Sequence, residues 1–138
     1  MKTKVLVTGA TGNVGAPAIG HLLEKYAHNV EVTAAVTDVA RARQVLLRPG
    51  LHFVRFNFED PSTVRAALAG VDKLFLLRPP QLSDVQKYIE PVILAAKAAG
   101  VKHLVFLSLQ GVVLNKGTPL YKIEQFIQRE GLPYTCLR

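Results

Sequence analysis

The chain has 138 residues, of which 49% are hydrophobic and 20% charged, a composition typical of one soluble globular domain. The single cysteine, Cys136, excludes an internal disulfide and a cysteine-rich zinc site. The 17 basic and 10 acidic residues give a net charge of +7, which suits an anionic ligand. The basic residues are scattered, however, without the continuous stripe and interleaved aromatic residues of a nucleic-acid binder.

No stretch approaches the roughly 20 apolar residues that a membrane span needs. The first apolar run is also too short for a signal peptide. We therefore expect a cytoplasmic protein that binds neither membrane nor nucleic acid.

Short apolar runs alternate with helical segments along the whole chain. The predicted strands are residues 4–8, 30–36, 51–56, 73–77, 101–108 and 134–137. The predicted helices are residues 13–26, 39–47, 61–69, 83–99 and 119–130. Six strands alternating with five helices predict an α/β fold, a doubly wound parallel sheet in the order 3-2-1-4-5-6 between two helical layers.

Boundary residues mark the ends of the last two helices. Ser83 is a candidate cap for the fourth helix, and Pro91 within that helix predicts a kink. Thr118 is expected to cap the fifth helix and Gly131 to end it.

A glycine-rich turn separates the first strand from the first helix. Gly9 allows a tight turn, Gly12 lets a pyrophosphate approach the backbone, and Gly15 lets helix and strand pack closely. Free N–H groups at the start of the helix would then hold the phosphates. The candidate cofactor-binding residues of this turn are Gly9, Thr11, Gly12, Asn13, Val14 and Gly15. In this position the turn predicts a Rossmann-type dinucleotide-binding domain rather than a plain strand–helix connection.

The turn T-G-A-T-G-N-V-G (residues 8–15) is one of four segments that occur together in a known family. The others are N-F-E-D-P (57–61), A-A-G-V-K-H-L-V-F-L-S (98–108) and Y-K-I-E-Q-F-I-Q-R-E-G-L-P-Y-T-C-L-R (121–138). With them the chain resembles the NmrA-like and quinone-reductase-like branch of the atypical short-chain dehydrogenase/reductases. The resemblance implies one NAD(P)-binding domain over residues 1–138. It also implies that the C-terminal substrate region of the family is absent from this chain.

The choice between NAD and NADP depends on the end of the second strand, where an acid binds the ribose hydroxyl and arginines accept a 2′-phosphate. Thr37 stands where NADP-preferring relatives usually carry arginine. Asp38 is either an acid for NAD or the cap of the next helix. Arg41 and Arg43 belong to a window without acids, residues 39–58, and favour NADP.

Two further segments follow predicted strands on the cofactor side. The resemblance places Asn57 and Phe58 beside the adenine, although Phe58 is equally well explained by core packing. Leu77 and Arg78 follow the fourth strand, where the chain is expected to pass beneath the dinucleotide. Arg78 either touches the pyrophosphate or faces solvent.

The tyrosine–lysine pair of typical short-chain dehydrogenases is absent, since no tyrosine is followed four residues later by lysine. The remaining catalytic candidates are Ser108, after the fifth strand, and Tyr121 and Lys122, at the start of the fifth helix. The resemblance makes Lys122 the best match to a lysine near the nicotinamide. The four histidines lie on different elements without ligand spacing, so we expect no metal.

Two functions remain in view. One is an oxidoreductase in which NADPH reduces a small acceptor such as a quinone, and the other is a dinucleotide-binding sensor without turnover. The last strand, residues 134–137, would lie at an open edge of the sheet, so we also expect a possible homo-oligomer through this edge.

Overall fold

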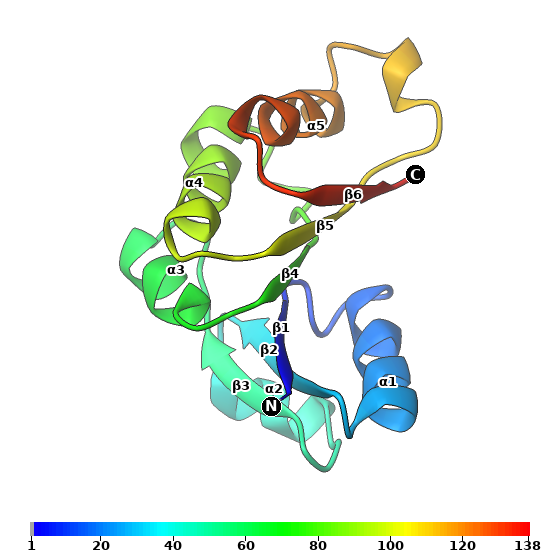
Figure 1. Ribbon diagram of the computed structural model, residues 1–138, viewed down its shortest axis with the longest axis vertical. Helices are drawn as coiled ribbons and strands as arrows, with labels where there is room; N and C mark the ends of the chain where they lie inside the picture. The colour runs from blue at the N-terminus through cyan, green and yellow to red at the C-terminus, as the bar shows by residue number, and fades with distance from the viewer. Residues whose placement is uncertain (1) are drawn as a thin grey trace.

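A computed structural model describes residues 2–138 and shows six strands and five α-helices, with two short helical turns (Figure 1). The strands are β1 (Thr3–Val7), β2 (Val30–Val36), β3 (His52–Arg55), β4 (Lys73–Leu76), β5 (His103–Leu107) and β6 (Tyr134–Leu137). The α-helices are α1 (Gly15–Tyr26), α2 (Val39–Val45), α3 (Pro61–Leu68), α4 (Glu90–Ala98) and α5 (Pro119–Glu130). Each predicted strand and helix is found, with ends that move by a few residues at most except in the fourth helix.

All neighbouring strands pair in parallel, in the order β3-β2-β1-β4-β5-β6. This order confirms the predicted Rossmann-type topology. The chain runs outward in one direction from β1 to β3 and then returns to add β4 on the other side of β1. Because the order reverses there, the carboxyl ends of β1 and β4 border the crevice in which such sheets bind ligands.

Two hydrophobic cores cover the two faces of the sheet. One core contains Ile19 of α1 together with Ala42 and Leu46 at α2. The other contains Leu68 of α3, Ile93 of α4 and further residues of α5. Figure 1 shows α3, α4 and α5 on one side of the sheet and α1 on the other. This arrangement confirms the three-layer architecture.

The fourth helix differs from its prediction. A π-helical turn, η1 (Val85–Ile89), comes first, and its cap is Asp84, whose carboxylate accepts a hydrogen bond from the N–H of Lys87 at 3.1 Å. The expectation that Ser83 caps this helix is therefore wrong, because the helical turn begins one residue later. Pro91 does not lie mid-helix but in the first turn of α4. The missing N–H of proline is tolerated in a first turn, because the N–H groups there have no partner within the helix. The fifth helix has the predicted ends, with Thr118 as its cap and Gly131 after its last residue at φ +75°.

β6 is an edge strand, as predicted from the order of the sheet. Tyr134 and Leu137 are 40% and 44% exposed, whereas Cys136 packs partly against the larger core. Self-association through this edge stays a prediction. Among residues 2–138, no helix combines the length and the hydropathy that crossing a membrane requires.

Candidate functional site

A cavity of about 540 Å³ opens at the carboxyl edge of the sheet. Its walls come from the turn after β1, the end of β2, the start of α2, the segment after β3 and the segment after β4. The lining residues are Thr8, Gly9, Ala10, Thr11, Ala35, Val36, Thr37, Asp38, Arg41, Ala42, Val45, Phe56, Phe58 and Pro79. Four separate segments of the chain thus form one site, which we call the β1–β3 cavity.

The glycine turn has the geometry that its spacing predicts. Gly9 has φ +61°, in the region that favours glycine. A Cβ on Gly15 would lie 2.1 Å from the carbonyl oxygen of Gly9, so only glycine allows α1 to start so close to the turn. A Cβ on Gly12 would meet only that same oxygen, at 3.3 Å, and its other surroundings are open. The backbone at Gly12 is therefore accessible to a bound group.

The start of α1 offers hydrogen-bond donors to an anion. Val14, at the cap position, has no side-chain cap, and in residues 2–138 the N–H groups of Asn13 and Val14 have no acceptor. Pyrophosphate is a good partner for such groups, because unpaired N–H groups and the helix dipole both favour negative charge. The turn therefore fits the phosphates of a dinucleotide on the shape and polarity of its backbone.

At the end of β2, Asp38 and Arg41 both line the cavity. The carboxylate of Asp38 accepts a hydrogen bond from the backbone N–H of Arg41 at 3.1 Å, so Asp38 does cap α2. The guanidinium of Arg43 lies 5.7 Å from the centre of the Phe53 ring, and Arg43 is not part of the cavity wall. Two positions along a helix correspond to a rotation of about 200° around its axis. Arg41 and Arg43 therefore point to nearly opposite sides of α2.

The segment after β3 provides an aromatic wall. The rings of Phe56 and Phe58 meet edge to face with centroids 5.0 Å apart, and both line the cavity. Phe58 also packs against the larger core, which is one of the two roles considered from the sequence. Its contact with the adenine stays a prediction. Asn57 is occupied in the local turn, where its side-chain oxygen accepts from the N–H of Glu59 at 2.9 Å. It does not line the cavity.

Thr8 joins the ends of β1 and β4 beneath the cavity. Its hydroxyl oxygen accepts from the N–H of Leu77 at 2.8 Å, and the hydroxyl lies 3.2 Å from the carbonyl oxygen of the same residue. Arg78 turns its guanidinium to its own loop, donating to the carbonyl oxygens of Pro80 and Leu82, each at 3.1 Å. Arg78 therefore stabilises the loop that carries Pro79 into the cavity wall.

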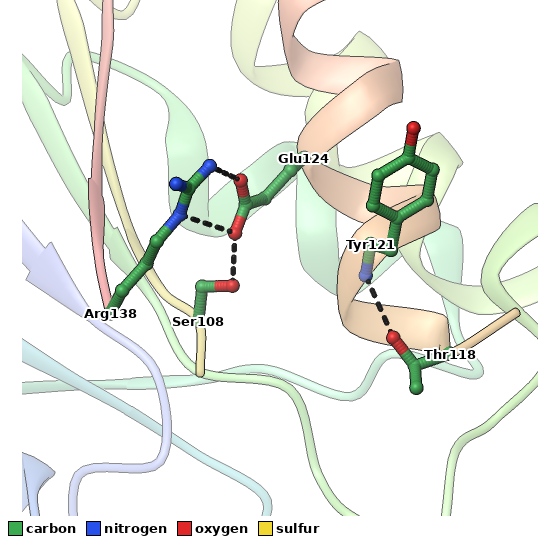
Figure 2. Close-up of polar contacts among 5 residues, drawn as sticks. All are labelled: Ser108, Thr118, Tyr121, Glu124 and Arg138. Atoms are coloured by element: carbon green, nitrogen blue, oxygen red, sulfur yellow. Dashed lines mark hydrogen bonds and ion pairs between the residues drawn. The ribbon is translucent and has the colours of Figure 1, made fainter. Parts of the chain in front are cut away.

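A second polar cluster lies at the carboxyl ends of β5 and β6 (Figure 2). Glu124 of α5 is only 1% exposed, and its carboxylate accepts from Arg138 Nη2 at 2.6 Å and from Ser108 Oγ. Burial by itself raises the pKa of Glu124, but the hydrogen bonds from Arg138 and Ser108 outweigh it and lower that pKa below its ordinary value. Glu124 is thus a buried, ionised carboxylate.

Tyr121 and Lys122 lie apart from this cluster. Both line a separate cavity of about 390 Å³ between η1 and α5. Lys122 is exposed, and its position on α5 is about 200° from that of Glu124. Figure 2 shows the Tyr121 ring on the other side of the helix from the Glu124 carboxylate. The structure does not bring these two candidates together with Ser108.

Glu124 and Arg138 were not singled out from the sequence. One signal was present, because Glu124 interrupts the buried helical stripe of Ile123, Phe126 and Ile127. A charge on the buried face of a helix requires a partner. The partner itself lies 14 residues further on, beyond the reach of helical periodicity.

The parallel sheet, the glycine turn and the β1–β3 cavity at the reversal of strand order define a Rossmann-type domain with a site shaped for a dinucleotide. Residues 1–137 match the model of the NmrA-like family, and the chain belongs to this family.

Relatives and solved structures match nearly the whole chain. It is 35% identical to prestalk A differentiation protein A of Dictyostelium discoideum, covering 99% of this chain and 44% of that protein. It is 34% identical to the NAD(P)H azoreductase of Xenophilus azovorans, over 97% of this chain and 46% of the azoreductase. A similar fold is found in the crystal structure of the NADPH-dependent quinone oxidoreductase QOR2 of Escherichia coli, complexed with NADPH. The two superpose with a TM-score of 0.82 at 30% sequence identity, over 97% of this chain and 48% of QOR2. The chain thus spans about half the length of these relatives.

Proposed function

We propose that this domain binds NADPH and forms the nucleotide-binding half of an oxidoreductase that reduces a small acceptor such as a quinone. The observation that carries the proposal is the β1–β3 cavity, which is lined by Gly9 and Thr11 of the glycine turn and by Arg41 of α2. The open backbone of Gly12 follows directly in the same turn. The QOR2 structure, of similar fold, holds NADPH, and the azoreductase is named for NAD(P)H.

In this proposal the start of α1 and the walls of the cavity each have a defined task. The N–H groups of Asn13 and Val14 hold the pyrophosphate, while the absence of a side chain at Gly12 leaves room for it. Phe58 packs against the adenine, and Thr37 and Asp38 border the adenosine ribose. Asn57 and Leu77 act indirectly, by shaping the turns after β3 and β4.

The preference for NADPH over NADH is assigned to Arg41. Arg41 belongs to the cavity wall close to the end of β2, where a 2′-phosphate would lie. Asp38 uses one carboxylate oxygen to cap α2, so that oxygen is less available to a ribose hydroxyl. Arg43, which lies over Phe53, contributes only long-range attraction.

NADPH itself supplies the hydride, so the protein mainly has to position the cofactor and the acceptor. Ser108 is our candidate at the nicotinamide end of the cofactor, because it follows β5 at the same edge of the sheet as the β1–β3 cavity. Lys122 remains a candidate from the family resemblance, and Tyr121 remains one from its place at the start of α5. The separate cavity that they line gives them no added support.

The alternative is a dinucleotide sensor without turnover. It is favoured by the absence of a tyrosine–lysine pair and by the relative named for differentiation rather than for a reaction. The two functions are separated by following NADPH absorbance with a panel of quinones, beside a calorimetric titration with NADPH. Binding with quinone-dependent oxidation supports the reductase, whereas binding without oxidation supports the sensor. No binding refutes both.

A further inference from the structure

The buried carboxylate of Glu124 joins three elements that border the far side of the binding edge. Its two oxygens accept from the guanidinium of Arg138, at 2.6 Å to Nη2 and 3.4 Å to Nε, and one of them also accepts from the hydroxyl of Ser108. The cluster thereby links α5 to the carboxyl ends of β5 and β6 (Figure 2). None of these contacts belongs to the β1–β3 cavity.

The direction of the hydrogen bond from Ser108 follows from the charge of its partner. An ionised carboxylate has only acceptor atoms, so the Ser108 hydroxyl must donate its single proton to Glu124. The pKa of Glu124 is lowered, which keeps the carboxylate in this state at neutral pH. The remaining lone pairs of Ser108 Oγ are then all that the hydroxyl can offer to another group.

The strand order places Ser108 on the side of the sheet toward which the second half of a dinucleotide would extend. The β1–β3 cavity accounts for one half, at the ends of β1, β2 and β3. Dinucleotides bind across the reversal of strand order, so the other half extends over β4 and β5. Neighbouring strands are about 4.8 Å apart, and Ser108 directly follows β5, two strands from β1.

We propose that Glu124 is a positioning residue that fixes Ser108 as a hydrogen-bond acceptor for the carboxamide N–H of the nicotinamide. This inference rests on the proposed NADPH binding and adds the group that recognises the nicotinamide end. A carboxamide offers N–H donors, which match the free lone pairs of Ser108. The same geometry excludes Ser108 as a proton donor to the acceptor substrate.

The test compares two ligands on the same chain. NADP⁺ carries the nicotinamide, whereas 2′-phospho-ADP-ribose has the rest of the molecule without it. Ser108→Ala and Glu124→Gln should weaken NADP⁺ about fivefold, the value of one hydrogen bond, and leave 2′-phospho-ADP-ribose unchanged. Glu130→Gln is the matched control on α5, because Glu130 pairs with Lys97 outside the cluster. Glu130→Gln should bind NADP⁺ and 2′-phospho-ADP-ribose with the affinities of the wild type.

A third ligand tests the carboxamide directly. The acetylpyridine analogue of NADP⁺ has a methyl ketone in place of the amide, so Ser108→Ala should not change its affinity. Ser108→Ala leaves the Glu124–Arg138 pair in place, which keeps the test decisive if Glu124→Gln fails to fold. Equal losses for NADP⁺ and 2′-phospho-ADP-ribose, or an unchanged affinity for NADP⁺, would overturn the inference. If the wild type binds neither ligand, the proposed function fails, and the inference fails with it.

Discussion

The two sides of the binding edge are built in different ways. On the β1–β3 side the turn is shaped by backbone, with Gly9 at positive φ and Gly15 against the Gly9 carbonyl. On the β5–β6 side the geometry depends on side chains, in the cluster of Ser108, Glu124 and Arg138. A backbone site tolerates changes of charge but not of volume, whereas the cluster depends on charge and hydrogen bonds. Substitutions that add volume should therefore have the larger effect on the β1–β3 side, and substitutions that remove charge should have the larger effect on the β5–β6 side.

The largest effect is expected at Gly15. Gly15→Ala places a Cβ 2.1 Å from the Gly9 oxygen, so the start of α1 must move and the unfolding free energy should fall by about 3 kcal/mol. Gly12→Ala is the matched control, because its Cβ has one contact at 3.3 Å and its φ is not positive. Urea denaturation of the two variants compares them. Equal stability would show that the close approach of helix and turn does not constrain the fold.

The next effect is expected at Glu124, and it depends on pH. In the folded protein the pKa of Glu124 lies below the ordinary value of 4.5. The ionised carboxylate therefore makes its full contribution to the free energy of unfolding above pH 4.5, and this contribution is lost as the pH falls through the folded pKa. Glu124→Gln should cost about 2 kcal/mol at neutral pH, less than for a fully buried pair because Arg138 is partly exposed.

Urea denaturation of the wild type and Glu124→Gln from pH 7 to pH 3 measures this difference. The gap between them should close as the solution becomes acidic. A gap that is the same at both ends of the range would show that the carboxylate is not ionised in the folded protein.

These two regions were not equally predictable from the sequence. The turn was predictable because its three glycines act within seven residues and each has a local steric reason. The cluster was not, because Glu124 meets Ser108 and Arg138 only after β5 and β6 have paired and α5 has packed on the sheet. The roles of the two arginines of α2 were predictable only in part. Helical geometry alone implies that Arg41 and Arg43 point in different directions, and the structure shows which of them meets the cavity.

A smaller effect is expected for cofactor choice. Arg41→Ala should weaken NADPH about tenfold and leave NADH nearly unchanged, since it removes a charge-assisted contact to the 2′-phosphate. Arg43→Ala is the control with the same change of charge, and its effect should be small and vanish with added salt. Calorimetric titrations at two salt concentrations provide the comparison. If the two variants lose NADPH affinity equally, the arginines act only through net charge.

The smallest effect concerns Cys136, the one cysteine of the chain. Burial, and then the charge of Glu124, raise its pKa to about 11. At pH 8 about a thousandth of the thiol is ionised, so iodoacetamide should react slowly, and the rate should rise toward pH 11. The urea-unfolded chain is the control and should react faster at pH 8. Equal rates in the folded and unfolded chains would show that neither burial nor the charge of Glu124 lowers the reactivity of Cys136.

The central claim, that the glycine turn and the β1–β3 cavity bind NADPH, is tested most directly by titrating the wild type and Gly12→Val with NADPH in a calorimeter. The valine side chain would occupy the open space where the pyrophosphate approaches the backbone, and its Cβ would meet only one backbone atom of the turn, the Gly9 oxygen at 3.3 Å. We predict saturable binding by the wild type and none by Gly12→Val, with similar circular dichroism spectra for both. Equal NADPH affinity in the two proteins would contradict the account.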